Sequence, residues 1–147
     1  MTTTKTTTPG KIETYLFFDG RCEEAIEFYR RTLGAEVLMM MRFKDNPEPT
    51  QPGACGGPGT ENKIMHASLK IGDTNFMASD GRCQGKASFQ GFALSIAAPN
   101  VAEADRLFAA LSDGGQVQMP LTKTFFSPSF GMLADRFGVT WMILVQT

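Results

Sequence analysis

The pattern of apolar and polar positions near the start of the chain predicts a strand, a helix and a second strand. Residues 12–18 are β-branched and aromatic and are followed by the turn pair Asp19-Gly20, as is typical of a strand. The next apolar residues recur at spacings of four, three and four, the period of a helix: Cys22, Ile26, Tyr29 and Leu33. Gly34 is placed to end that helix, and residues 36–43 are apolar and short enough for a buried strand.

A loop and two further strands complete this first half. Residues 44–62 carry four of the eight prolines and four glycines, so we expect a long mobile loop there. Beyond it, residues 64–71 alternate in polarity with a period of two, which predicts a strand with His66 and Ser68 on its more polar face. A further strand is expected over 75–79.

The second half repeats this order of elements. We expect a strand over 92–98 and then an amphipathic helix that begins after Asn100, a good N-cap, and ends at Gly114-Gly115. Three short strands follow it, at residues 116–119, 130–135 and 140–145. We interpret the chain as an α+β protein with two βαβββ modules, at approximately 11–80 and 88–147, in a single domain spanning 1–147.

Length and charge narrow the classes of partner. A chain of 147 residues can bury a core without disulfides or metals. Because 14 Lys and Arg are scattered among 15 Asp and Glu, no concentrated positive field exists and nucleic acid is not an expected partner. Residues 1–10 are rich in threonine and indicate a disordered tail rather than a signal peptide. No apolar stretch approaches the ~20 residues of a spanning helix, so we expect a cytoplasmic protein without membrane contact.

The histidine and cysteine content excludes several kinds of site. His66 is the only histidine, which excludes metal sites built from several histidines and limits any Ser-His or Cys-His device to one base. Cys22, Cys55 and Cys83 are too far apart in sequence for a Cys-x-x-Cys motif, and their odd number argues against a disulfide framework.

Segments along nearly the whole chain resemble one branch of a known superfamily. They read Tyr-Leu-Phe-Phe-Asp-Gly at 15–20, Glu-Ala-Ile-Glu-Phe-Tyr at 24–29, His-Ala-Ser-Leu at 66–69, Met-Ala-Ser-Asp at 77–80 and Asp-Arg-Phe-Gly-Val-Thr-Trp-Met-Ile at 135–143. On these segments the chain resembles the PhnB-like branch of the vicinal-oxygen-chelate superfamily, which includes glyoxalase I, extradiol dioxygenases and bleomycin-resistance proteins. The resemblance implies two modules whose mixed sheets curl into a cup, with helices outside, a ligand cavity inside and a homodimeric assembly.

The same resemblance bears on metal binding. Superfamily enzymes take one His, Gln or Glu ligand from the first and last strands of each module, and these places fall near Thr14, Met77, Phe92 and Met142. None of these residues is a good ligand, and Glu13 would point to the opposite face of its strand. Some relatives carry a demethylubiquinone methyltransferase name, but neither strand-to-helix junction has a glycine-rich turn for a nucleotide-like cofactor. We therefore expect no metal and no cofactor.

The leading hypothesis is a PhnB-like protein that binds a small molecule in the cup without the usual metal. One alternative is a metal-dependent lyase, dioxygenase or resistance-type enzyme with displaced ligands such as Glu13, His66 and Asp80. Another is an interaction module that only forms dimers and has a filled cavity. Whether the protein is an enzyme stays open at this point.

Five residues are the candidates for the site. His66 is the candidate catalytic residue, because an imidazole can act as a general base or bind an anionic or carbonyl ligand near neutral pH. Ser68 shares its face, and Asp80 ends the next strand, where it would orient His66 or contact a ligand, although Asp-Gly pairs are also common in turns. Phe126 and Phe130 would form an aromatic wall for a planar ligand, although aromatic residues are also usual in cores.

Overall fold

The chain folds into two modules that repeat one order of elements. The structure is a computed structural model that describes residues 7–8, 10–48, 59–81 and 86–146. The first module contains β1 (Thr14–Phe17), α1 (Cys22–Leu33), β2 (Glu36–Arg42), the short 3-10 helix η1 (Phe43–Asp45), β3 (Ile64–Ile71) and β4 (Thr74–Ser79). The second module contains β5 (Leu94–Ala98), α2 (Val101–Ser112), β6 (Gln116–Thr122), β7 (Phe130–Ala134) and β8 (Thr140–Val145).

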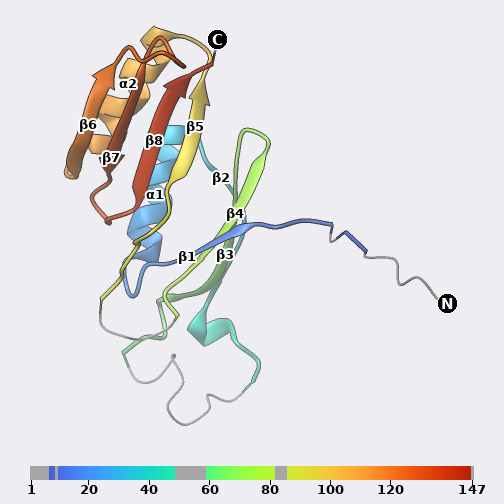
Figure 1. The fold of residues 1–147 in the computed structure, drawn as a ribbon. Helices are drawn as coiled ribbons and strands as arrows, with labels where there is room; N and C mark the ends of the chain where they lie inside the picture. The colour runs from blue at the N-terminus through green and yellow to red at the C-terminus, as the bar shows by residue number, and fades with distance from the viewer. Residues whose placement is uncertain (1–6, 9, 49–58, 82–85, 147) are drawn as a thin grey trace, which may run out of the picture.

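Each module forms its own four-stranded mixed sheet (Figure 1). The strand order is β1-β4-β3-β2 in the first sheet and β5-β8-β7-β6 in the second. In both sheets the first and last strands of the module are parallel neighbours, and the other pairs are antiparallel. The predicted α+β class, with two βαβββ modules and curled mixed sheets, is confirmed.

Hydrogen bonds and one glycine conformation define where the helices begin and where α1 ends. α2 begins at its predicted N-cap, because the side chain of Asn100 accepts a 2.8 Å hydrogen bond from a backbone N–H of the first turn. α1 ends at Gly34, whose φ of 68° is the left-handed conformation that glycine adopts most readily. The side chain of Arg21 makes no capping hydrogen bond at the start of α1. A distant carboxylate replaces it, since Asp80 accepts a 2.8 Å hydrogen bond from the backbone N–H of Cys22.

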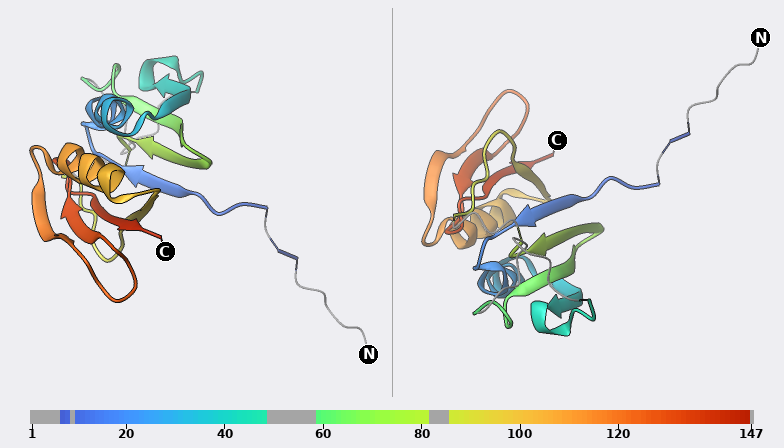
Figure 2. Two further views of the ribbon diagram at one scale, coloured as in Figure 1. Left: turned by 90° about the horizontal axis from the view of Figure 1, so that it is seen from above. Right: turned by 90° about the horizontal axis from the view of Figure 1, so that it is seen from below.

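α1 joins the two modules. Its residue Tyr29 packs edge-on against Phe137 and Trp141 of the second module, with ring centroids 6.2 and 5.6 Å apart. Apolar side chains from the helix-covered faces of both sheets form one contiguous core. Because α1 and α2 lie side by side (Figure 2), both covered faces contribute to this core and each sheet keeps one face that no helix covers. The two sheets are separate, because no strand of one is hydrogen-bonded to a strand of the other.

Several strand boundaries differ by one to three residues from the sequence-based prediction, and those of β5 and β6 differ as follows. β5 begins at Leu94, and Phe92, whose side chain is 43% exposed, lies in the connection before it. β6 continues to Thr122 although it contains Pro120. Proline is tolerated there because β6 is an edge strand of its sheet, where a backbone N–H needs no partner within the sheet.

Parts of the predicted tail and loop lie outside the described residues. They are residues 1–6 and 9 of the tail and 49–58 of the loop expected over 44–62; Cys55 and Cys83 also fall outside. The described ends of that loop are held close to α1. Arg42 donates a 2.6 Å hydrogen bond to the carbonyl of Asn62 and forms a 2.6 Å ion pair with Glu23. Within the described ranges, neither α1 nor α2 has the length and apolar character needed to cross a bilayer.

Candidate functional site

The uncovered face of the first sheet carries the histidine that the sequence singles out. The alternate residues of its strands are fully buried on the opposite, helix-covered face: Leu16, Ala67, Leu69 and Ala78. His66 and Ser68 of β3 are half-buried and lie on the open face, as the period of two predicts. The strand register places Ser68 beside Met77 of β4, and Met77 in turn beside Tyr15 of β1.

Tyr15 and His66 form a hydrogen-bonded pair on this open face. The Tyr15 hydroxyl and His66 Nδ1 are 2.8 Å apart, and the centroids of the two rings are 5.5 Å apart. Tyr15 also stacks on Phe17, with centroids 4.8 Å apart. When the hydroxyl donates to Nδ1, the neutral imidazole carries its proton on Nε2. Within the described part of the chain Nε2 has no hydrogen-bond partner, so this nitrogen remains open to a ligand.

Burial reinforces the neutral state of Tyr15. Desolvation raises the pKa of Tyr15 above its usual value of 10.0, and the opposing effect of Ser79 does not cancel this increase. The phenol is therefore a neutral hydrogen-bond donor at physiological pH. With the phenol donating to Nδ1, the Nε2–H group of the imidazole is the donor that suits a carbonyl, hydroxyl or anionic group of a small molecule.

A cavity opens beside Tyr15. It has a volume of about 380 Å³ and lies between β1 and the connection that leads to β5. Its lining includes four aromatic rings and two opposite charges: Tyr15, Phe17, Phe89, Phe92, Asp19 and Lys86. A cavity of this volume, with aromatic, charged and polar side chains in its wall, has the size of a small-molecule site. Tyr15, Phe17, Lys86 and Phe89 are not among the site residues predicted from the sequence.

Asp80 is buried and fully engaged by the backbone. Its Oδ1 accepts hydrogen bonds from the N–H groups of Gly20 and Cys22 at 2.7 and 2.8 Å, and its Oδ2 accepts one from Ile64 at 2.9 Å. These bonds tie the β1–α1 turn to the start of β3. The predicted role of Asp80 in orienting His66 or contacting a ligand finds no support in this geometry, because both carboxylate oxygens already serve the fold.

Phe126 and Phe130 lie in the second module, whereas His66 lies in a strand of the first module's sheet. Phe130 of β7 is 8% exposed and Phe126 is 47% exposed, and their rings meet nearly at right angles with centroids 5.1 Å apart. Phe130 belongs to the open face of the second sheet, since it alternates along β7 with the fully buried Leu133 and its inward neighbour Gly131. The structure therefore brings these two rings together, but on a different sheet from His66 and Ser68.

The two open faces carry rows of residues in the same register. Across the first sheet the row is Tyr15, Met77, Ser68 and Met39. Across the second sheet the equivalent row is Ser95, Met142, Met132 and Met119. In each sheet an irregularity in the outermost strand directly precedes the methionine, between Val37 and Met39 and between Val117 and Met119. The two modules therefore match in strand register and in the position of the strand irregularity, as well as in the order of their elements.

This register corrects two of the places that the resemblance assigned to metal ligands. Thr14 pairs with the buried Phe76, so the open-face residue of β1 is Tyr15. Phe92 precedes β5, where Ser95 is the residue paired with Met142. The four places therefore carry a phenol, a hydroxyl and two thioethers, which are not the carboxylate, amide or imidazole ligands typical of the superfamily enzymes.

The displaced ligand set considered from the sequence does not come together either. Glu13 forms an ion pair of 3.7 Å with Lys11, and both oxygens of Asp80 are bound by backbone N–H groups, so neither joins His66. Among the residues that the structure describes, no three His, Cys, Asp or Glu side chains gather closely enough to hold a metal ion.

Comparisons with known proteins agree with this architecture. Residues 10–144 match the family model described as 3-demethylubiquinone-9 3-methyltransferase. The chain is 39% identical over 135 residues to Protein YjdN of Escherichia coli K12, covering 89% of this chain and 92% of that protein. It is 42% identical to the crystal structure of PA1353 from Pseudomonas aeruginosa, with a TM-score of 0.79 over 92% of this chain and 97% of that one.

Two further structures connect the family name to the fold. The first, from Bacillus cereus, is titled a putative 3-demethylubiquinone-9 3-methyltransferase, PhnB protein; it is 30% identical, with a TM-score of 0.76 over 92% of this chain and 98% of that one. The second, a glyoxylase/bleomycin resistance protein/dioxygenase domain from Frankia, is 11% identical with a TM-score of 0.65 over 97% of this chain and 100% of that one, and shows the fold alone. By sequence, this chain belongs to the PhnB-like family, whose model bears the 3-demethylubiquinone-9 3-methyltransferase name, and its fold is shared with a glyoxylase/bleomycin resistance protein/dioxygenase domain.

Proposed function

We propose that this PhnB-like protein binds a small molecule at the open face of its first sheet and does so without a metal ion. The observation that carries the proposal is the Tyr15–His66 pair, hydrogen-bonded at 2.8 Å on a face that no helix covers. The cavity of about 380 Å³ that Tyr15 and Phe17 line supplies the adjoining space. A planar, partly apolar ligand would stack near these rings and present a carbonyl, hydroxyl or anionic group to the pair.

The residues of the site suit binding and proton transfer more than metal chemistry. The two expected ligand places on the first sheet carry Tyr15 and Met77, so a divalent ion would lack the oxygen and nitrogen ligands that it prefers. His66 Nδ1 is paired to a neutral phenol, which fixes the orientation of the imidazole and leaves Nε2–H as a hydrogen-bond donor to a ligand. Any catalysis at this site would therefore use the Nε2–H of His66 to polarise or protonate a group of the ligand. We assign none of the described residues a role in methyl transfer, the reaction that the family name describes.

We also propose a homodimer, as the family implies. Large apolar side chains on the edge strands β2 and β6 are exposed in the single chain, including Leu38 at 48% and Val117 at 50%. A second copy of the chain would remove these surfaces from water. The cytoplasmic location expected from the sequence stays a prediction.

The binding proposal is tested by a screen of aromatic carbonyl and phenol fragments against the ¹⁵N-labelled full chain. We expect binders to perturb the resonances of Tyr15, Phe17 and His66, and to lose at least about tenfold in affinity in Tyr15→Phe and His66→Gln. Ser95→Ala is the matched control, because Ser95 holds the place of Tyr15 in the equivalent row of the second sheet. Fragments that bind both variants as tightly as the original protein would overturn the site.

The metal-free part of the proposal has a separate test. Protein purified without chelators is analysed for zinc, nickel, manganese and iron. We expect less than one metal ion per ten chains and fragment affinities that are unchanged by added metal. One equivalent of a divalent metal held by the chain, and lost in His66→Gln, would contradict it.

A further inference from the structure

The turn between β1 and α1 contains a carboxylate oxygen without a partner. Asp19 has a φ of 49°, the left-handed conformation that aspartate adopts only at special turns. Its Oδ2 is buried and accepts no hydrogen bond. The donors nearest in sequence are already committed, because the N–H groups of Gly20 and Cys22 both donate to Asp80. A buried acceptor in this state is destabilising until a donor reaches it, and the residues that the structure describes supply none.

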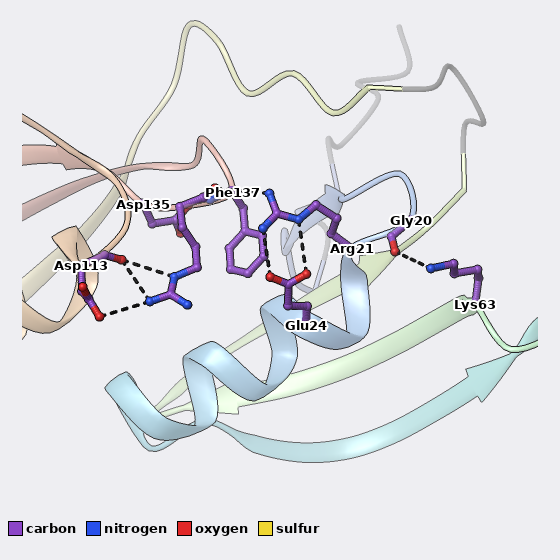
Figure 3. Close-up of polar contacts among 8 residues, drawn as sticks. Gly20, Arg21, Glu24, Lys63, Asp113, Asp135 and Phe137 are labelled. Atoms are coloured by element: carbon purple, nitrogen blue, oxygen red, sulfur yellow. Dashed lines mark hydrogen bonds and ion pairs between the residues drawn. The ribbon is translucent and has the colours of Figure 1, made fainter.

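The cationic side chains around the turn are also committed elsewhere (Figure 3). Lys63 donates a 2.9 Å hydrogen bond to the carbonyl of Gly20. Arg21 forms a 2.9 Å ion pair with Glu24, and its guanidinium lies 4.5 Å from the centroid of the Phe137 ring. Neither cation forms an ion pair with Asp19 within the described residues. Among the described residues, none therefore donates to Asp19 Oδ2.

Asp19 faces two adjoining cavities. The cavity of about 380 Å³ beside Tyr15 and a second one of about 300 Å³ are both lined by Asp19 and Lys86. Lys86 is exposed, and none of the salt bridges among the described residues involves it. Two opposite charges thus border the same space without neutralising each other. Phe17, Phe89 and Phe92 complete the first cavity with aromatic rings.

We propose that this space binds a zwitterionic small molecule of the amino-acid type. Its ammonium group would donate to Asp19 Oδ2, its carboxylate or other anionic group would pair with Lys86, and its apolar side chain would pack against Phe17, Phe89 and Phe92. The inference rests on the proposed function, since Tyr15 and Phe17 are shared, and it names the class of ligand that the site accepts.

The chemistry favours an ammonium group over a metal ion at Asp19. Calcium and magnesium need several oxygen ligands, whereas Asp19 is the only carboxylate among the described lining residues of the two cavities. Aromatic faces around the site attract an ammonium group, and they exclude water from its hydrogen bond to the carboxylate. The opposite charge at Lys86 disfavours a simple cation and favours a molecule that carries both charges.

Three probes with one aromatic ring and different charges test the proposal. They are L-phenylalanine, which is zwitterionic, 2-phenylethylamine, which is cationic, and 3-phenylpropionate, which is anionic. Binding to the full chain is measured by isothermal titration and by chemical-shift perturbation. We expect L-phenylalanine to bind at least about tenfold more tightly than either other probe. Equal affinities for all three, or no binding by any of them, would overturn the amino-acid class.

Two variants that each remove one charge show which residue binds the ammonium group of the probes and which binds the carboxylate. Asp19→Asn keeps the shape of the side chain and tolerates the left-handed conformation, so the turn should be retained. It should weaken L-phenylalanine and 2-phenylethylamine about tenfold and leave 3-phenylpropionate unchanged. Lys86→Met should weaken L-phenylalanine and 3-phenylpropionate and leave 2-phenylethylamine unchanged. If Asp19→Asn leaves the affinity for L-phenylalanine unchanged, the assignment is wrong.

The same variants separate this inference from the proposed function. Fragments that lose affinity in His66→Gln but not in Asp19→Asn or Lys86→Met would support the Tyr15–His66 site and overturn the zwitterion assignment. L-phenylalanine binding that depends on Asp19 and Lys86, but is unchanged in Tyr15→Phe and His66→Gln, would support the zwitterion site and count against the proposed role of the pair.

Discussion

The phenol of Tyr29 on α1 donates a 2.5 Å hydrogen bond to Oδ2 of Asp135, the residue that follows β7. This bond links the two modules inside the shared core, where Tyr29 is 1% and Asp135 3% exposed. Asp135 also accepts from the indole Nε1–H of Trp141 and from the backbone N–H groups of Phe137 and Val139. The carboxylate is therefore well supported by donors, and among the described residues Tyr29 is the one donor that comes from the first module.

Replacing Tyr29 by phenylalanine should weaken the contact between the modules. We expect Tyr29→Phe to lower the free energy of unfolding by about 2 kcal/mol, because it removes a buried hydrogen bond to a charged group. Urea unfolding followed by tryptophan fluorescence measures the change, since Trp141 is the only tryptophan and touches Tyr29. Tyr15→Phe is the matched control, at the chain's other tyrosine, and should cost less than about 1 kcal/mol because Tyr15 lies on an open face. Equal losses in the two variants would argue against a special role for the Tyr29–Asp135 bond.

Stability should fall in alkaline solution. Burial and the nearby charge of Asp135 raise the pKa of Tyr29 well above 10.0 in the folded chain, and burial likewise raises the pKa of Cys22 and of Tyr15. A folded state that holds its protons more tightly than the unfolded state keeps this stabilisation below the unfolded pKa and loses it as the pH rises toward the folded pKa. For one tyrosine the loss is about 1.4 kcal/mol per pH unit above a pH of about 10.

The contribution of Tyr29 to this pH dependence can be isolated. Urea midpoints measured between neutral pH and pH 11 should decline above pH 10 in the original chain. The decline should be shallower in Tyr29→Phe, because Phe cannot ionise in the unfolded state. A Tyr29→Phe chain with the same alkaline slope as the original would show that other groups control it.

Asp80 should be required for folding rather than for binding alone. Asp80→Ala leaves three backbone N–H groups without their acceptor, two of them in the buried environment of Cys22 and Ile64. We expect a loss of about 3 kcal/mol in the free energy of unfolding, measured on the protein without ligand. Asp73→Ala, at an exposed position between β3 and β4, is the control and should change it by less than about 0.5 kcal/mol. A stable Asp80→Ala chain with impaired fragment binding would instead favour the ligand-contact role expected from the sequence.

The residues of the site differ in how far the sequence could predict them. Alternation along one strand is enough to place His66 and Ser68 on the same open face, because the period of a strand is a local property. The partner of His66 is not local, since Tyr15 reaches it only through the order β1-β4-β3 of the folded sheet. A sequence shows that Tyr15 alternates with Leu16 but not which of the two faces the helix.

The different roles of Asp80 and Asp19 also could not be predicted from the local sequence. Both precede a glycine, and in a sequence each has the appearance of an ordinary turn residue. The folded structure shows that their hydrogen bonding differs. Asp80 accepts hydrogen bonds from backbone N–H groups of the β1–α1 turn, whereas Oδ2 of Asp19, within that turn, accepts none from the described residues. The difference depends on donors 58 and 60 residues away from Asp80 along the chain, which no local pattern contains.

The single histidine makes the Tyr15–His66 pair directly observable. Because His66 is the only histidine, the imidazole signals in a ¹⁵N spectrum belong to it without assignment. A Tyr15 hydroxyl that donates to Nδ1 fixes the tautomer with the proton on Nε2. We therefore expect the neutral ring to show one protonated and one hydrogen-bonded, unprotonated nitrogen, and Tyr15→Phe to shift the unprotonated Nδ1 signal while the backbone spectrum stays that of a folded chain. Ser95→Ala should leave both nitrogen signals in place. If the imidazole signals are the same with and without the Tyr15 hydroxyl, the pair is not formed in solution, and the geometric basis of the proposed binding site is lost with it.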